Sequence, residues 1–429
     1  MTDAIPKSVP EVWAIVKIGD ILSEVAEPIQ MKDTEIYRLI SIRRRNGGIF
    51  ERDCLPGNKI LTKDLHRVIP GTFLIANRQI VHGACAYVSD EFADAVVSTA
   101  YTSLKGNENC NILWFSWIAK TPLLKKYFLD ASQGVVLEKM NFHVKEWLEF
   151  PIVLPSIPEQ SLIATILNHT EALIDQTDRL LQKYQRIKKG LMQDLFHYGI
   201  DEQGNLRSEE THRLRDSPLG RVPVEWEIQS LEKMCYLIQD GTHYSPNTDL
   251  NGKYKYLTSK NIRFGKMDLS NFDLIDEKSH RRIYNKCPVK KYDVLLTKDG
   301  VNTGNATINY LDEEFSILSS VALIRGNERL LLNSFILQFI LSDNGQKMIK
   351  DSMKGLAISR ITLQIIKKFL ILKPDLNEQS RIVAILHQVD EVIEKEEFNK
   401  QKLIALKAGL MDDLLSGKVR INHMIPAEA

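Results

Sequence analysis

The chain has 429 residues, of which 44% are hydrophobic and 26% charged, and its formal net charge is +1. This composition is typical of a globular protein with about two to four domains, and it argues against disorder and against nucleic-acid binding through bulk positive charge alone. No apolar run approaches the roughly 20 residues that span a bilayer, and the first residues lack a signal-peptide pattern, so we expect a cytoplasmic protein. The five cysteines are widely spaced, which indicates neither a disulfide framework nor a zinc site.

The first segment of the chain, residues 1–153, predicts a mixed α/β domain. Runs in which apolar and polar residues alternate, such as residues 36–45, predict half-buried strands. Residues 111–132 have the amphipathic pattern of helices.

A long helix is predicted to follow at residues 154–199. Ser156 and Glu159 have the spacing of a capping box, which would fix the start of this helix. Apolar residues recur in three- and four-residue steps, a stripe suited to packing against another helix. This stripe contains Leu162, Ile166, Leu173, Leu180, Tyr184, Ile187 and Leu191.

The second half of the chain repeats the first. A connector is predicted at residues 200–225, a second mixed domain at 226–373, a second long helix at 374–421 and a tail at 422–429. A single offset of 219 residues aligns the two helices, from Glu159-Gln160-Ser161 with Glu378-Gln379-Ser380 to Gly190-Leu191-Met192 with Gly409-Leu410-Met411. A repeat of domain size implies two large units rather than a solenoid.

The repeat predicts an α+β fold with two pseudo-symmetric mixed α/β domains, each followed by a long helix. The second helix repeats the capping pattern at Asp375 and Glu378. Its stripe contains Ile382, Leu386, Val389, Ile393, Leu403, Leu406 and Leu410. A single helix of this kind would more simply be core or a homodimer zipper. Two copies in one chain favour pairing with each other as an antiparallel coiled coil.

Catalytic motifs are missing from the sequence. It contains no phosphate-binding loop ending in Lys-Ser/Thr, no GxSxG, no HExxH and no Asx-Pro-Pro-aromatic tetrad of amino methyltransferases. We therefore expect a binding protein rather than an enzyme.

Four features in a fixed order resemble the specificity (S) subunit of type I restriction-modification enzymes. Both helices begin with Pro-x-x-x-Glu-Gln-x-x-Ile, at residues 155–163 and 374–382; residues 216–223 read DSPLGRVP and precede Glu225-Trp226; and residues 415–421 read LSGKVRI. The resemblance implies a DNA-binding subunit without catalytic activity, in which each domain reads one half of a bipartite, asymmetric site. It also implies that the helix pair sets the spacing between the half-sites and docks two methyltransferase (M) subunits. Restriction/translocase (R) subunits would then complete the enzyme, and S-adenosylmethionine, ATP and magnesium would bind to these partners.

Residues that could contact double-stranded DNA lie at strand ends that correspond between the halves. Arg, Lys, Asn and Gln bond to base edges, and Lys, Arg, Ser and Thr hold phosphates. Some of these residues are expected to stabilise loops instead. The predicted set is Arg43, Arg44, Arg45, Asn46, Asn77, Arg78 and Gln79 in the first half, and Ser259, Lys260, Asn261, Arg263, Lys298, Asn302, Thr303, Asn305 and Arg360 in the second.

Two alternatives remain open at the level of sequence. One is the specificity subunit of a related system that is not type I, because the missing catalytic motifs would lie in a partner either way. The other is a structural adaptor that organises a complex without reading DNA, although the paired basic strand ends argue against it.

Overall fold

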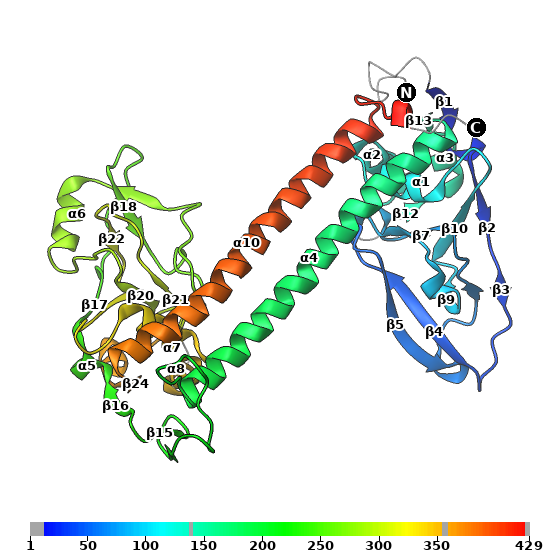
Figure 1. The fold of residues 1–429 in the computed structure, drawn as a ribbon. Helices are drawn as coiled ribbons and strands as arrows, with labels where there is room; N and C mark the ends of the chain where they lie inside the picture. Colours follow the sequence, from blue (N-terminus) through cyan, green and yellow to red (C-terminus); the bar gives the residue numbers. More distant parts are fainter. Residues whose placement is uncertain (1–12, 137–139, 354–358, 425–429) are drawn as a thin grey trace. The chain divides into compact units, whose positions relative to one another are not determined.

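The computed structural model describes residues 13–136, 140–353 and 359–424. The chain forms two compact units, each with its own mixed α/β domain and a part of each of two long helices (Figure 1). Unit 1 comprises Met1–Asp178 and Phe398–Ala429, and unit 2 comprises Arg179–Glu397. Among the described residues, no helix combines the length and the apolar character needed to cross a membrane.

The domain of unit 1 contains two sheets. A four-stranded antiparallel sheet has the order β2-β10-β7-β8, and a five-stranded sheet has the order β3-β6-β9-β4-β5. The bounds of these strands are β2 Leu22–Val25, β3 Pro28–Ile29, β4 Ile36–Ile42, β5 Ile49–Pro56, β6 Leu65–Arg67, β7 Phe73–Ala76, β8 Cys85–Tyr87, β9 Ala95–Ser98 and β10 Tyr101–Gly106.

Strand β7 lies between two hydrophobic cores, because successive side chains of a strand point to opposite faces. Phe73 and Ile75 pack with the helices α1 (Ile112–Ile118), α2 (Pro122–Asp130) and α3 (Val144–Leu148), whereas Leu74 and Ala76 pack with Ile40 of β4. Two short strand pairs complete the domain: β1 (Ala14–Lys17) with β13 (Pro151–Leu154), and β11 (Ser132–Gln133) with β12 (Asn141–Phe142).

Unit 2 has a similar arrangement, but its second sheet has three strands where that of unit 1 has five. Its four-stranded sheet has the order β17-β23-β20-β21, its second sheet has the order β19-β18-β22, and β16 pairs with β24 as β1 pairs with β13. β18 and β22 run parallel to each other, as do β4 and β9 in unit 1. The bounds are β16 Glu227–Ser230, β17 Cys235–Asp240, β18 Tyr254–Leu257, β19 Asp273–Ile275, β20 Val294–Thr297, β21 Ala306–Ile308, β22 Ser316–Ile317, β23 Val321–Gly326 and β24 Leu370–Lys373; the helices are α5 Leu231–Met234, α6 Glu277–Tyr284, α7 Asn333–Leu341, α8 Asp343–Ser352 and α9 Leu363–Lys368.

The segment that joins α4 to the second domain packs onto unit 2. It forms a small antiparallel pair, β14 (Leu214–Arg215) with β15 (Val222–Pro223). Val222 is fully buried, and Leu219 packs against the same core as Trp226. The connector is therefore an integral part of unit 2 and not only a surface link.

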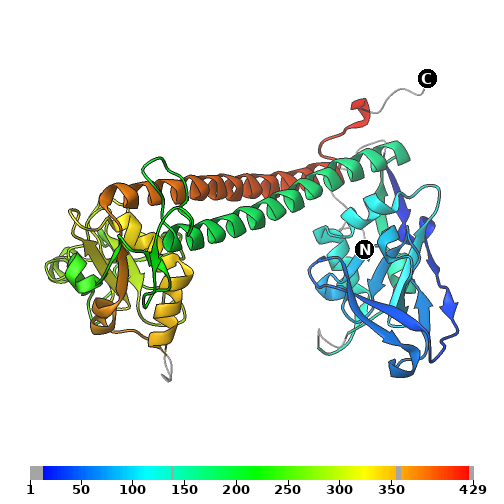
Figure 2. The same cartoon turned by 60° about the horizontal axis from the view of Figure 1, so that its bottom comes forward.

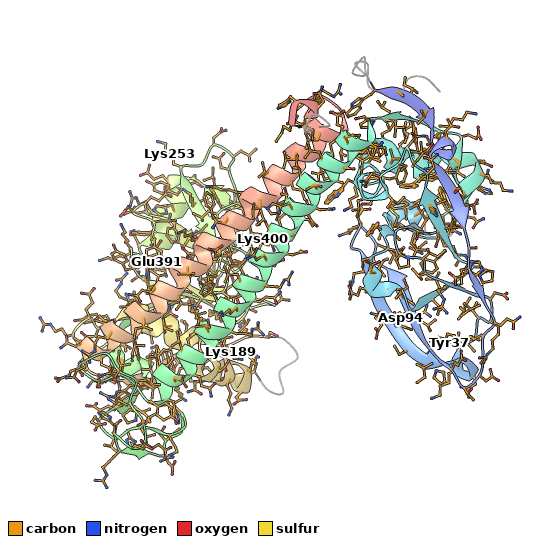
Figure 3. All side chains as sticks on the ribbon, turned by 45° about the vertical axis from the view of Figure 1, so that its right-hand side comes forward. Tyr37, Asp94, Lys189, Lys253, Glu391 and Lys400 are labelled. Atoms are coloured by element: carbon orange, nitrogen blue, oxygen red, sulfur yellow. The ribbon has the colours of Figure 1, made fainter. Side chains whose placement is uncertain are left out.

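The two long helices, α4 (Ile157–His197) and α10 (Leu376–Leu415), pair in antiparallel fashion within each unit (Figures 1 and 2). In unit 1, Lys407 of α10 pairs with Glu171 of α4, and Lys400 of α10, which is labelled in Figure 3, pairs with Asp178 of α4. In unit 2, Lys188 Nζ lies 2.6 Å from Asp390 Oδ1. The residue numbers rise along one helix as they fall along the other, so the predicted α+β fold with an antiparallel helix pair is confirmed.

The apolar stripe predicted for the first helix is off by about one residue. The structure buries Ile163, Leu167, Ile174 and Leu181, whereas Leu173 and Ile187 of the predicted stripe are 37% and 41% exposed. Both sets of residues recur with helical spacing, so the sequence pattern does not distinguish the face that packs on the domain from its neighbour.

The predicted cap of the second helix is confirmed in one half, because Asp375 Oδ1 accepts a hydrogen bond of 2.9 Å from the amide of Glu378. The reciprocal half of both capping boxes is wrong, because the side chains of Glu159 and Glu378 bond elsewhere. Glu159 Oε2 accepts a hydrogen bond of 2.9 Å from the indole of Trp13, and both its oxygens bond to Arg420. Glu378 Oε2 accepts one of 2.9 Å from Trp226. Each carboxylate thus ties the start of its helix to the residue that opens its domain.

Glu378 has further partners in unit 2. Arg207 Nη1 lies 2.8 Å from Glu378 Oε1, and the backbone amide of Ile200 donates to the same oxygen at 2.9 Å. Both partners follow α4 in the chain, as Arg420 follows α10, so the segment after one helix is held at the start of the other.

The glutamine beside each glutamate binds three backbone groups. Gln160 accepts from the amide of Asn111 at 2.8 Å and donates to the carbonyl oxygens of Asn109 and Pro155. Gln379 makes the same three bonds with Leu332, Leu330 and Pro374. In each unit, the Glu-Gln pair therefore connects the start of the long helix to the domain by hydrogen bonds.

Candidate nucleic-acid interface

In unit 1, two loops that carry predicted DNA contacts lie against each other. The turn at residues 43–48 joins β4 to β5, and the loop at residues 77–84 joins β7 to β8. The amides of Arg45 and Asn46 donate to the carbonyl oxygens of His82 and Gly83, at 2.7 and 2.9 Å. The ends of β4 and β7 therefore lie side by side, and the DNA contacts predicted for both ends stay a prediction.

The arginines of this surface differ in what they contact. Arg44 Nε donates to Gln79 Oε1 at 2.8 Å, and the guanidinium of Arg43 lies 4.4 Å from the centroid of the Phe50 ring, in the geometry of a cation–π contact. Arg45 and Arg78 are exposed, and their side chains make no hydrogen bond or ion pair with the described part of the chain. These two guanidinium groups keep all their donors available for a ligand.

The two asparagines of unit 1 are half-buried. Asn77 Oδ1 accepts a hydrogen bond from Thr102 Oγ1 at 3.1 Å. Asn46 has φ 56° and follows Arg45 with φ 58°, so both residues have the left-handed backbone conformation of a tight turn. Asn46 therefore helps to shape the turn that presents the arginines.

In unit 2, the loop after β18, the loop after β20 and Arg360 come together. Asn302 Nδ2 donates to the carbonyl oxygen of Ser259 at 3.4 Å, and Asn305 Nδ2 donates to that of Ile262 at 3.3 Å. Thr303 Oγ1 and the amide of Gly300 both donate to the carbonyl oxygen of Ser359. The two loops and the segment at residues 359–360 therefore lie against one another in unit 2.

Two predicted contacts in unit 2 are corrected, because their side chains are buried. Asn261 is 3% exposed; its Nδ2 donates to the carbonyl oxygens of Asp268 and Asn271, and its Oδ1 accepts from the amide of Thr258. Lys298 is 2% exposed and its Nζ lies 3.1 Å from Asp240 Oδ2. Both side chains stabilise the loops, and we remove them from the set of proposed DNA contacts.

The charged residues left in unit 2 are mostly paired with acids. Arg263 lies 3.3 Å from Asp268, and hydrogen bonds from Ser270 and Arg263 lower the pKa of that carboxyl group. Arg360 Nε lies 3.7 Å from Asp299. Lys260 is exposed, and its side chain has no such partner within the described residues.

Sequence reasoning did not identify the exposed apolar side chains of unit 2. Val301 is 100% exposed in the loop after β20, beside Asn302, and Phe264 is 54% exposed in the loop after β18. An apolar residue inside a run of turn-forming residues was the available signal, since such a position has no core to pack into. Apolar groups in a DNA-reading surface contact thymine methyl groups or stack on bases.

The comparisons with known proteins agree with this geometry. Residues 223–406 match the family model of the type I restriction modification DNA specificity domain. The chain is 22% identical to the type I restriction enzyme MjaVIII specificity subunit of Methanocaldococcus jannaschii, over 97% of this chain and 95% of that protein.

The fold also matches solved structures along its whole length. The S subunit of a type I restriction-modification system from M. genitalium superposes with a TM-score of 0.60 at 14% identity, and the match covers 100% of both chains. A chain solved to explain complex assembly and conformational transition of the type I R-M system gives 0.54 at 18% identity, over 96% of this chain and 100% of that one. The resemblance to type I specificity subunits is therefore confirmed in sequence and in fold.

Proposed function

We infer that this chain is the DNA-sequence-recognition subunit of a type I restriction-modification complex. Each domain reads one half of a bipartite site. The observation that carries this inference is the pair of domains that share the order of their four-stranded sheet but differ in their strand-end side chains, which are of the types that bond to bases and phosphates. Since the two loop sets differ, the two half-sites differ, and the complete site is asymmetric.

The proposed contact surface of unit 1 centres on Arg45 and Arg78, with Arg43, Arg44 and Gln79 beside them. That of unit 2 centres on Lys260, Asn302 and Arg360, with Ser259, Arg263, Thr303 and Asn305 beside them. The formal net charge of +1 indicates that this chain alone neutralises few phosphates. We expect it to bind DNA weakly by itself and tightly in complex with its partner.

Two M subunits are proposed to dock on the long helices, whose two copies offer similar faces. The exposed apolar residues of α10 within unit 1 fit this role, since Phe398 is 60% and Leu406 53% exposed, and Leu173 of α4 adds to them. A contiguous group of exposed apolar side chains is typical of a surface that another protein covers. R subunits would join this core to complete the enzyme.

Catalysis is proposed to belong to these partners, together with S-adenosylmethionine, ATP and magnesium. The chain itself would contribute recognition, and the helix pair would set the number of base pairs between the half-sites. The absence of a catalytic motif from the sequence supports this division of labour.

The test is single-molecule sequencing of methylated adenines in cells that express this chain with its M partner, beside cells that lack the chain. We expect a bipartite methylated motif with a fixed gap that disappears when the chain is deleted. A motif that persists without the chain, or no motif in the presence of a competent M subunit, would contradict the proposal.

A further inference from the structure

Unit 1 contains an apolar groove that the proposed function does not use. It lies where the end of α10 meets the turn between α1 and α2, and its volume is about 440 Å³. Ile118 and Leu123 line one side, and Met411 and Leu415 of α10 line the other. The lining is mostly hydrocarbon, so water gains little there and an apolar side chain would be favoured.

The corresponding place in unit 2 is identified by matching hydrogen bonds. Thr121 accepts from the amide of Leu124 and caps α2, as Ser342 accepts from Gly345 and caps α8. The offset between the long helices places Met192 and Phe196 of α4 where unit 1 has Met411 and Leu415. Met192, Phe196 and Ser342 line a cavity together, as Met411, Leu415 and Thr121 do.

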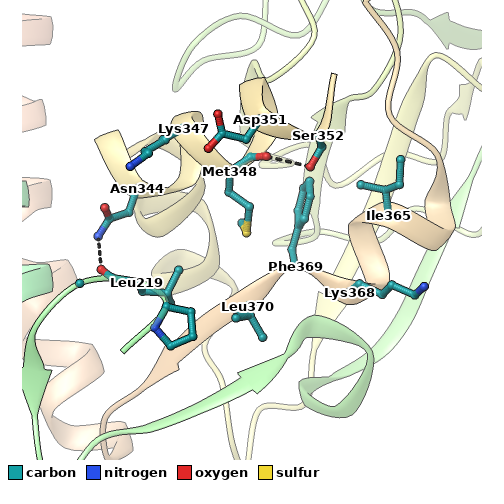
Figure 4. Close-up of a pocket in the computed structure, with 12 residues that line it drawn as sticks. Leu219, Asn344, Lys347, Met348, Asp351, Ser352, Ile365, Lys368, Phe369 and Leu370 are labelled. Atoms are coloured by element: carbon teal, nitrogen blue, oxygen red, sulfur yellow. Dashed lines mark hydrogen bonds between the residues drawn. The ribbon is translucent and has the colours of Figure 1, made fainter. Parts of the chain in front are cut away.

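In unit 2, a segment of the chain lies across this place. Leu219 and Gly220 line the cavity. Asn344 Nδ2 donates to the carbonyl oxygen of Leu219 at 3.2 Å, a hydrogen bond drawn in Figure 4, which shows a second pocket that also contains Leu219 and Asn344. Leu219 packs against the core of unit 2, three residues before the fully buried Val222. In unit 2, the position that corresponds to the groove is therefore occupied by the segment that leads to Trp226.

The sequence before Trp13 repeats that stretch. An offset of 213 residues aligns residues 2–13, TDAIPKSVPEVW, with residues 215–226, RDSPLGRVPVEW. Four identities result, at Asp3, Val9, Pro10 and Trp13, and the apolar pair Ile5-Pro6 falls on Pro218-Leu219. The two tryptophans are structural equivalents, because each donates its indole N–H to a helix-start glutamate at 2.9 Å.

We propose that the groove of unit 1 is the docking site for the N-terminal segment of the same chain, with Ile5 and Pro6 against Leu123, Met411 and Leu415. Residues 1–12 lie outside the described part of the chain. Pro6 is as many residues from Trp13 as Leu219 is from Trp226. In unit 2, a segment of this length reaches from the tryptophan to the corresponding cavity. Leu123 stands where unit 2 has Asn344, so the contact in unit 1 is apolar and the docked segment presents an apolar pair to match it.

A photo-crosslinking residue, benzoylphenylalanine, placed at Ile5 of the full chain tests this directly. We expect adducts within residues 118–123 and 408–416, mapped by mass spectrometry. The same residue placed at Pro218 is the matched control, and its adducts should fall within residues 342–352. Adducts of position 5 that lie elsewhere would overturn the proposal.

The source of the docked segment is tested by mixing ¹⁵N-labelled and unlabelled protein before irradiation. Adducts that join labelled to unlabelled peptides would show a second copy in the groove and overturn the proposal. Hydrogen exchange provides an independent measurement. The double variant Ile5→Asp, Pro6→Asp should raise exchange at residues 408–416 several-fold, whereas Ser8→Asp, aligned with the exposed Arg221, should not. Equal exchange in all three proteins would overturn the proposal as well.

Discussion

The loop after β4 in unit 1 is a tight turn at residues 43–48, closed by a hydrogen bond of 2.9 Å from the amide of Arg43 to the carbonyl oxygen of Gly48. The corresponding loop in unit 2, after β18, runs from Thr258 to Phe272 and is held by the buried side chain of Asn261. These two loops therefore differ between the units. The starts of the long helices are alike, since Glu159 and Glu378 each bind one tryptophan and one arginine.

This difference follows from burial. Glu159 and Glu378, which we call the anchor glutamates, are each 1% exposed. A substitution of either leaves buried donors without a partner, at a free-energy cost that is a large part of the stability of a domain. Exposed loop side chains such as Arg45 and Lys260 are solvated in the unbound protein, and substitutions there cost little folding free energy. Two domains with one scaffold can therefore diverge in what they bind.

The largest predicted effect is the loss of an anchor. Glu378→Ala should destabilise unit 2 by about 3–5 kcal/mol, because it leaves Arg207, Trp226 and the amide of Ile200 without their acceptor. Glu159→Ala should destabilise unit 1 by less, since within the described residues the carboxylate bonds to two side chains, Trp13 and Arg420, and to no backbone amide. Hydrogen exchange in peptides of each unit measures the two effects separately.

Glu378→Gln is the matched control for this comparison. It retains one acceptor oxygen, for either the indole or the amide, and it removes the charge opposite Arg207, so the loss should be intermediate. Protection in unit 2 that is unchanged by Glu378→Ala would contradict the role of the carboxylate as an anchor.

The next effect concerns the half-sites. Arg78→Ala should weaken specific DNA binding, measured with the M partner present, by about 1–3 kcal/mol if the residue reads a base. Methylation should then become less selective at the half-site read by unit 1 only, and Arg360→Ala should relax the other half-site. Arg52→Ala is a control for charge, because this exposed arginine lies on β5 and away from the turn at residues 43–48. An unchanged ratio of specific to non-specific affinity would remove Arg78 from the interface.

A third prediction separates loop support from DNA contact in unit 2. Asn261→Ala should cost about 1–3 kcal/mol of stability, because the carbonyl oxygens of Asp268 and Asn271 lose their donor. The ratio of specific to non-specific DNA affinity, measured well below the unfolding temperature, should not change. A variant that folds normally but has lost specificity would restore Asn261 to the interface.

The sequence was sufficient to predict the repeat, the mixed domains and the antiparallel helix pair, because hydrophobic periodicity and the Glu-Gln motifs are local signals. It was not sufficient for the partners of Glu159, since Arg420 lies 261 residues away in the chain and a capping box has the same local spacing. Asn261 and Lys298 were removed from the proposed DNA contacts because their side chains are buried. Their residue types suit DNA contact and loop support equally well, and only tertiary packing distinguishes the two roles.

The smallest predicted effect is a pH response confined to unit 2. His280 of α6 is fully buried, stacks on Tyr254 and lies 3.0 Å from Ser316 Oγ and 3.3 Å from Glu314 Oε2. Burial lowers the pKa of His280 below its usual value of 6.5; Glu314 and Glu277 oppose this shift, and Arg281 adds to it. The folded unit therefore holds the neutral imidazole, while the unfolded chain gains a proton as the pH falls below about 6.5.

The stability that the neutral imidazole supports is complete above that pH and declines as the pH falls through the window between the unfolded and the lowered folded pKa. Hydrogen exchange between pH 7 and 5, corrected for intrinsic rates, should show a loss of protection in α6 and β22 that His280→Gln abolishes. Strands β4 and β9, which correspond to β18 and β22, serve as the internal reference and should show no such loss. An equal response in both units would assign the pH dependence to groups that they share and not to His280.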